Sequence, residues 1–273
     1  ILPGVDSANP PSSPISPPPV TSYRPEYLPA YLSNGMLGLR VGRIPLLDGL
    51  CIVNGLAERD PVEDGEGFAR APYPLWGDVV VSGHGLSWHR EQASLVEQAY
   101  DFSCGELYTR FRFQPQSSSA QVEVLVFCSR SLPTVVGHEV RVEVDADCDL
   151  VITGGLNPAG IAGRWISRRT QTPGTDVPVV DGLMEWETSG GLSTCGAAYV
   201  TRFEGAEGVE RRVEDVDTRA PLQTSYAFRP PGPRVRDAPA LKSALQPPAQ
   251  RARSNGGALD LSGCDARLRC PAA

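Results

Sequence analysis

Two groups of carboxylates are the residues of this sequence that could carry out acid–base chemistry. The first is the pair Glu185 and Glu187, which strand alternation places on one face, with a tryptophan between them. The second is a Gly-rich polar stretch that holds Glu63, Asp64 and Glu66. A working pair needs one protonated and one ionised carboxyl group, positioned around a substrate. We interpret the first group as an exposed strand face and the second as solvated surface, so neither is predicted to be catalytic.

Three aspartates, Asp145, Asp147 and Asp149, have the first spacings of a calcium-binding loop. The pattern then fails, because Leu150 replaces the glycine of the turn and Leu156 stands where the bidentate glutamate belongs. We expect these acids to lie in a loop or at a strand edge, where charge resists pairing with another chain. No metal site and no cofactor are predicted.

The sequence also lacks a set of residues that could carry out nucleophilic catalysis. The stretch 191–196 comes close to a nucleophile elbow, but Cys195 replaces the last glycine, and no strand–turn–helix context surrounds it. The available bases are three histidines, His84, His89 and His138, and no Ser/His/Asp or Cys/His set can be assembled from them. The sequence therefore predicts no catalytic residue.

The composition limits the class of protein. The chain has 273 residues, of which 41% are hydrophobic, enough for a sizeable core. A net charge of -7 argues against a nucleic-acid surface, and no apolar run approaches the roughly 20 residues that cross a bilayer. Seven cysteines without a CxxC motif favour a reducing, cytoplasmic location. Because the sequence begins at Ile1, we expect an incomplete N-terminus.

The elements that would position these residues follow a period of two. Leu107, Thr109, Phe111 and Phe113 share one face of a predicted strand. Residues 122–128 are almost continuously apolar, which predicts a strand buried on both faces. Residues 23–229 contain no amphipathic pattern of a long helix. Many short strands separated by Gly and Pro indicate an all-β fold, a sandwich of two sheets.

The two ends differ from this patterned region. Residues 1–22 are rich in Pro and Ser, and residues 230–273 are rich in Ala, Arg and Pro without a sustained period. Such segments cannot bury enough apolar surface to offset the entropy of ordering, so we expect both to be disordered. Within the tail, 240–246 could form one or two helical turns. One domain is therefore predicted, over 23–229.

Four segments, in order, resemble the N-terminal domain of glycoside hydrolase family 65, across roughly residues 25–160. They are the turn in 31–40 with its Asn34-Gly35, the strand 51–55, the passage 71–83, and a long run from Gln98 through the strand 122–127 to Ser129-Arg130 and Pro133. The form of the first two is most similar to the branch that contains acid trehalases and protein-glucosylgalactosylhydroxylysine glucosidases. The disaccharide phosphorylases are a more distant match.

The resemblance implies a large, twisted super-β-sandwich of the galactose mutarotase-like type. In the family this domain packs on an α/α barrel that carries the catalytic groups and cleaves α-glucosides with inversion. The chain has no pattern for such a barrel, so we expect it to be missing and the chain alone to be inactive. Two alternatives stay open: a stand-alone carbohydrate-binding module, or the same domain of a disaccharide phosphorylase.

An α-glucoside partner would need contacts on this domain. Tryptophans can stack on sugar rings, although in a β-sandwich they are more often core residues. Trp76, which follows the loop 73–75, is the candidate we select among the four tryptophans. Asn54 is either a turn residue or a polar contact towards the missing barrel. Trp76 and Asn54 are thus the predicted sugar contacts.

Overall fold

The computed structural model describes residues 29–60, 62, 65–115, 118–170, 180–204, 208–214, 221–229 and 240–246. Within them the chain is built almost wholly from strands, and the helical elements are two short 3-10 turns, η1 (Arg90–Gln92) and η2 (Ser189–Gly191). The prediction of an all-β sandwich is confirmed. The predicted disorder of residues 1–22 lies outside the described residues.

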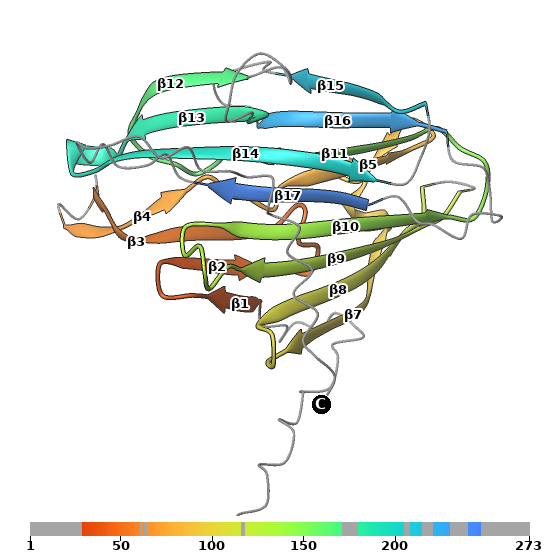
Figure 1. Cartoon of the computed structure of the whole chain (residues 1–273), viewed down its shortest axis with the longest axis horizontal. Coiled ribbons are helices and arrows are strands. Elements are labelled where there is room, and N and C mark those ends of the chain that lie inside the picture. The colour runs from red at the N-terminus through yellow and green to blue at the C-terminus, as the bar shows by residue number, and fades with distance from the viewer. Residues whose placement is uncertain are drawn as a thin grey trace, which may run out of the picture.

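The largest sheet has eight antiparallel strands in the order β12-β13-β14-β17-β10-β9-β8-β7, which Figure 1 shows from the top of the molecule to the bottom. Its members are β7 (Ala93–Asp101), β8 (Glu106–Phe113), β9 (Ala120–Cys128), β10 (Val136–Val144), β12 (Arg164–Thr170), β13 (Gly182–Glu187), β14 (Thr194–Glu204) and β17 (Ala240–Gln246).

Two smaller antiparallel sheets face the large one in place of the single second sheet that we expected. One has the order β1-β2-β3-β4 and the other the order β15-β16-β11-β5-β6. The first consists of β1 (Ala30–Ser33), β2 (Leu37–Val41), β3 (Gly49–Arg59) and β4 (Glu66–Ala71). The second consists of β5 (Gly77–Val81), β6 (His84–Gly85), β11 (Leu150–Leu156), β15 (Glu210–Glu214) and β16 (Leu222–Phe228).

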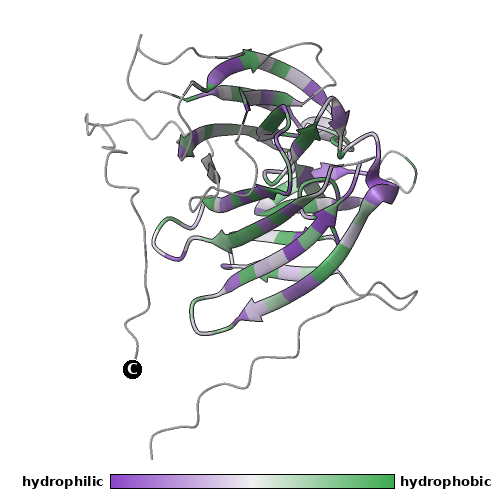
Figure 2. Cartoon of the chain, turned by 90° about the vertical axis from the view of Figure 1, so that its right-hand side faces the viewer, coloured by the Kyte–Doolittle hydropathy of each residue, from purple (hydrophilic) through white to green (hydrophobic). Residues whose placement is uncertain are grey.

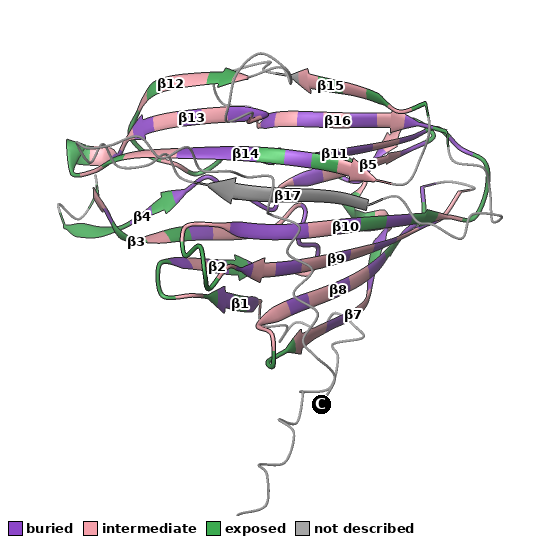
Figure 3. Ribbon diagram, viewed as in Figure 1, coloured by how far each residue is buried: buried purple, intermediate pink, exposed green. Residues whose placement is uncertain are grey.

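The core lies between these layers, where β11 packs on β14 and β17, and β1 approaches β9. In β9, Val122, Val124 and Val126 are completely buried, and the residues between them point to the other face. This alternation produces the hydrophobic and hydrophilic bands of Figure 2 and the buried and half-buried bands of Figure 3. The alternation of residues with a period of two in the sequence therefore corresponds to one buried face of the sheet.

Strand β9 is not buried on both faces, as we had expected from its apolar run. Leu125 and Phe127 point outward and are half-buried. Leu125 lies between Tyr108 of β8 and Glu139 of β10 in the ladder, and the ring of Phe127 covers Gly137. These neighbours in the same sheet cover the two side chains partly. An apolar run in the sequence is compatible with such partial cover and with burial under a second layer, so the sequence alone does not tell the two apart.

Strand β17 corrects the expectation for the tail. Residues 240–246 form neither a helical turn nor a disordered segment, but a central strand that pairs with β10 on one side and β14 on the other. The physical reason is main-chain pairing, because the edges of β10 and β14 would otherwise leave two rows of unpaired N–H and C=O groups. The remaining tail, 230–239 and 247–273, lies outside the described residues.

Candidate functional site

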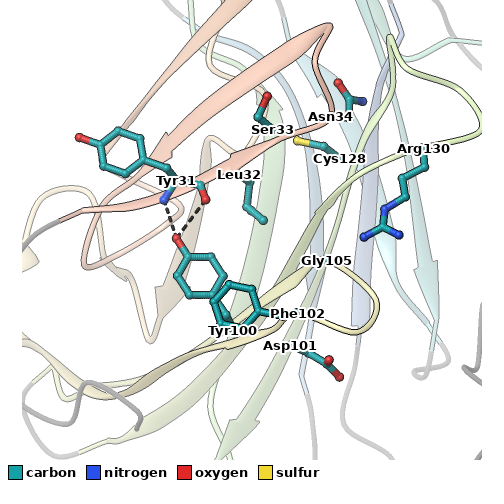
Figure 4. Close-up of a pocket in the computed structure, with 10 residues that line it drawn as sticks. All are labelled: Tyr31, Leu32, Ser33, Asn34, Tyr100, Asp101, Phe102, Gly105, Cys128 and Arg130. Atoms are coloured by element: carbon teal, nitrogen blue, oxygen red, sulfur yellow. Dashed lines mark hydrogen bonds between the residues drawn. The ribbon is translucent and has the colours of Figure 1, made fainter. Parts of the chain in front are cut away.

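A surface pocket of about 370 Å³ lies where the end of β1, the β7–β8 hairpin loop and the end of β9 meet (Figure 4). Its walls combine aromatic rings with charged and polar groups. The residues that matter for its chemistry are Tyr31, Asn34, Tyr100, Asp101, Phe102 and Arg130.

Two aromatic rings form one wall of the pocket. Tyr100 and Phe102 are two residues apart at the end of β7, and their rings stack with centroids 5.2 Å apart and an interplanar angle of 22°. The Tyr100 hydroxyl accepts a hydrogen bond of 2.6 Å from the Tyr31 N–H and donates one of 3.0 Å to the Tyr31 carbonyl oxygen. Tyr100 is therefore fixed to β1, and it holds the Phe102 ring in place while 54% of Phe102 stays exposed.

A carboxylate follows on the same hairpin. Asp101 accepts hydrogen bonds from the Ser103 hydroxyl at 2.6 Å and from the Ser103 N–H at 2.9 Å. These bonds, with a further one from Cys104, lower the pKa of Asp101 below its usual value. The carboxylate is therefore ionised at neutral pH and engaged within the β7–β8 hairpin loop, and Figure 4 shows it pointing away from Phe102 and Arg130.

A guanidinium forms the opposite wall. Arg130 follows β9 and makes no hydrogen bond or ion pair with any residue that the structure describes. Its guanidinium lies over Gly105, where an added Cβ would come within 3.1 Å of Nη2, as Figure 4 shows by the direction of the side chain. Gly105 also has a φ of 75°, a conformation that glycine adopts without strain. A glycine at this position therefore allows the turn and leaves room for the Arg130 guanidinium.

Asn34 fixes the geometry between these walls. Its side-chain oxygen accepts hydrogen bonds from the N–H groups of Met36 and Leu37, as expected for a turn residue, and Gly35 adopts a φ of 88°. Its side-chain nitrogen donates to the carbonyl oxygens of Ser129 at 2.6 Å and Pro133 at 2.9 Å. One side chain therefore holds both the β1–β2 turn and the loop that presents Arg130.

The predicted sugar contacts lie elsewhere. Trp76 is half-buried and packs against the hydrophobic core, and its carbonyl oxygen accepts a hydrogen bond from Gly155. Asn54 is exposed, and its side chain donates a long 3.3 Å hydrogen bond to the carbonyl oxygen of Gly35. Neither residue lines the pocket. Their contact with a sugar stays a prediction.

The carboxylates that could do acid–base chemistry are engaged on the surface. Glu185 accepts a hydrogen bond of 2.6 Å from Ser167, and Glu187 pairs with Arg164 at 3.1 Å, both on the outer face of the large sheet. Glu66 is exposed on β4, whereas Glu63 and Asp64 lie outside the described residues. None of the described members lines the pocket.

The remaining motifs have structural contacts. Asp145 accepts a hydrogen bond of 2.9 Å from the Ser119 N–H and Asp149 lies 3.7 Å from Arg229, and no metal-ligand cluster occurs among the described residues. His138 is buried in β10, away from the other two histidines, and burial lowers its pKa to about 4. The five cysteines that the structure describes are free thiols, and no described helix has the length and apolar character to cross a membrane.

Sequence reasoning missed a buried polar network between the sheets. The Asp181 carboxylate, directly before β13, pairs with the Arg211 guanidinium of β15 at 2.5 Å. The same carboxylate accepts hydrogen bonds from the Thr201 N–H at 2.7 Å and from the Thr201 and Thr224 hydroxyls. Asp181 is only 2% exposed, so the network is structural and closed to a ligand. No local pattern in the sequence joins residues 20 to 43 positions apart.

Comparison with known proteins supports the fold. No protein-family model matches the chain, and no curated protein matches it. Among solved structures, a human-microbiome protein assigned as a kojibiose phosphorylase matches 80% of this chain with a TM-score of 0.56 and 10% sequence identity. The match covers 29% of that protein, so this chain corresponds to a minor part of its length. At this identity the likeness is one of fold.

Proposed function

We propose that this chain is the non-catalytic β-sandwich domain of an enzyme that cleaves α-glucosides with inversion. In this proposal the sandwich packs on a helical barrel, and the barrel supplies the acid and the activated nucleophile. The observation that carries the proposal is the match in fold to 29% of the length of the kojibiose phosphorylase. The four segments that resemble glycoside hydrolase family 65 support it independently, because they were identified from the sequence.

The placement of Glu185 and Glu187 supports the non-catalytic part of the proposal. Inverting glycosidases hold two carboxyl groups about 6.5–9.5 Å apart on opposite sides of the sugar ring. Glu185 and Glu187 alternate on one strand and point to the same face, where each already has a hydrogen-bond partner. They cannot enclose a sugar from two sides.

The proposal covers a parent enzyme that uses either water or phosphate to cleave the bond. The resemblance in sequence is closer to the hydrolases, and the solved neighbour is assigned as a phosphorylase. Both types place their chemistry outside the β-sandwich, so the role proposed for this chain is the same.

An assay of the purified chain tests the proposal. We expect no glucose release from trehalose, maltose or kojibiose, with or without inorganic phosphate. The matched variants are Glu185→Gln and Glu187→Gln. Each removes one of the two carboxylates that share a face of β13 and that the sequence offered as an acid–base pair. Turnover that either substitution abolishes would place a working acid in the sandwich and overturn the proposal.

A further inference from the structure

We propose that the pocket between Phe102 and Arg130 binds a monocarboxylate, in which one carboxylate group is attached to a small apolar body. The inference depends on this pocket and not on the parent enzyme or its substrate. A negative result would therefore leave the proposed function intact, because that function rests on the fold.

Three polar side chains of the pocket are already engaged within the protein. The Asn34 amide and the Tyr100 hydroxyl each donate and accept hydrogen bonds with main-chain groups. The Asp101 carboxylate accepts hydrogen bonds from its own hairpin loop, and Figure 4 shows it pointing away from Phe102 and Arg130. These three groups therefore offer little to a ligand.

The guanidinium of Arg130, in contrast, is available to a ligand. It makes no hydrogen bond or ion pair with a residue that the structure describes. Figure 4 shows it directed towards Gly105, on the side of the pocket where Phe102 lies. The planar fork of a guanidinium can donate two parallel hydrogen bonds to a carboxylate, and such charge-assisted bonds are roughly twice as strong as bonds between neutral groups. The free charge of the pocket therefore favours a planar anion.

The loop that carries Arg130 is fixed before a ligand binds. The Asn34 side chain donates to the carbonyl oxygens of Ser129 and Pro133, which lie on either side of Arg130 in the chain. Within the loop, the Ser129 hydroxyl accepts a hydrogen bond of 3.1 Å from the Leu132 N–H. Because these bonds hold the main chain at Arg130, binding a ligand there orders little more than the side chain itself. Such pre-organisation lowers the entropic cost of binding.

An apolar surface lies across the pocket from this charge. Phe102 is 54% exposed, and a ligand that covers its ring with an apolar group removes apolar surface from water. The ring stacks on Tyr100, whose hydroxyl is bonded to the N–H and the carbonyl oxygen of Tyr31, so it is held in place. A small inorganic anion would leave this ring in water. The proposed ligand therefore has an aromatic or aliphatic body besides its carboxylate.

One negative charge suits the pocket better than two. Arg130 supplies one positive charge, and Asp101 still lines the pocket as an anion although its carboxylate points away. A dianion would keep an uncompensated charge, and Asp101 would repel it more strongly than it repels a monocarboxylate. The pocket volume of about 370 Å³ is at the lower end of the range of about 300–1,000 Å³ for small-molecule sites. We therefore expect a small acid.

The test measures ligand binding to the full chain by calorimetric titration and by saturation-transfer NMR, which detects weak ligands. Phenylacetate and hexanoate carry the carboxylate on an aromatic and on an aliphatic body. The alcohol 2-phenylethanol has the aromatic body without the charge, and inorganic phosphate has the charge without the body. Acetyl-glycyl-phenylalanine presents the same chemistry at the end of a peptide, and its C-terminal amide is the neutral counterpart.

Two variants remove the walls of the pocket, Phe102→Ala and Arg130→Gln. Two matched controls change the same residue types on β4. Phe68→Ala removes a phenylalanine that is 72% exposed. Arg70→Gln removes an exposed arginine that likewise makes no hydrogen bond or ion pair with a described residue. Neither control residue lines the pocket. Circular dichroism of each variant checks that it is folded.

We expect saturable binding of at least one of the carboxylates, weakened at least about tenfold by Arg130→Gln, at least about threefold by Phe102→Ala, and unchanged by the two controls. Tighter binding of the peptide acid than of phenylacetate would identify a chain end as the source of the carboxylate, and the reverse order would identify a free acid. The proposal is overturned if no carboxylate binds, or if the alcohol and the amide bind as tightly as the acids. It is also overturned if the controls weaken binding as much as the pocket variants, or if phosphate binds through Arg130 and the carboxylates do not.

Discussion

The side-chain amide of Asn34 donates a hydrogen bond of 2.6 Å to the carbonyl oxygen of Ser129, a residue 95 positions further along the chain. This bond joins two segments that the sequence marked separately, the Asn34-Gly35 turn and the Ser129-Arg130 end of a strand. It connects the small sheet β1–β4 to the large sheet at the rim of the pocket. Local turn chemistry and long-range packing therefore depend on the same side chain.

We predict that Asn34→Ala lowers the free energy of unfolding by about 1–3 kcal/mol, because partly buried main-chain groups lose their partners. Urea denaturation measures this. The control is Asn54→Ala, which removes one long hydrogen bond from an exposed asparagine and should have a smaller effect. Equal effects for the two variants would show that the Asn34–Ser129 connection does not contribute to stability.

Asp181 and Arg211 should be essential for stability. Asp181→Ala leaves the Arg211 guanidinium and the Thr201 N–H without their partner, and breaking a buried pair costs about 3–5 kcal/mol. We expect a loss near the lower bound, since Arg211 is 25% exposed and partly screened by water. The measurement is the midpoint of thermal unfolding.

The control for this pair is Glu210→Ala, which breaks an exposed ion pair with Arg212 and should change stability by less than about 1 kcal/mol. If Asp181→Ala unfolds at the same temperature as Glu210→Ala, the buried network has no structural role.

His138 should make the fold sensitive to acid. Its pKa is about 4 in the folded chain, against 6.5 for an unperturbed histidine, because burial penalises the charged ring. Between these values the unfolded chain binds a proton that the folded chain does not, so stability falls as pH decreases from about 6.5 to about 4. The largest contribution of this residue is about 3 kcal/mol.

We expect His138→Leu to flatten the dependence of unfolding free energy on pH in this window. The substitution also removes a buried ring nitrogen, Nε2, that has no hydrogen-bond partner. His89→Gln is the control, because the His89 side chain is partly exposed and its replacement should leave the slope unchanged. An unaltered slope in His138→Leu would refute this assignment.

Strand β17 should be indispensable, although its sequence gave no strand pattern. Ala244→Pro removes a main-chain donor from a strand that pairs on both sides, and proline is not tolerated in the middle of a sheet. We expect loss of cooperative unfolding. Ala244→Gly keeps the donor and should cost about 1 kcal/mol. A cooperative, native-like transition in Ala244→Pro would contradict the place of β17 in the sheet.

The sequence predicted the parts of the fold that depend on local order. The alternation of Leu107, Thr109, Phe111 and Phe113 became the buried face of β8, and the Asn34-Gly35 dipeptide became a turn with positive φ. Both are properties of neighbouring residues. The all-β class could be inferred from such patterns along the chain.

The features that were missed depend on residues far apart. β17 is a strand because two distant strands leave a space for it, and Asp181 is satisfied by residues of β14, β15 and β16. The pocket likewise combines the end of β7 with the end of β9. Phe102 and Arg130 both belong to the long segment that carries the resemblance, but nothing local in the sequence pairs them, and only the register of the strands brings them to one site.

The central claim is that this β-sandwich works beside a separate catalytic barrel, and the most direct test is to sequence the DNA that adjoins its coding region. The account predicts a reading frame, in phase or shifted by one base, that encodes an α/α barrel with a proton-donating glutamate. An adjoining sequence that encodes no helical domain, together with glucose release by the purified chain alone, would contradict it.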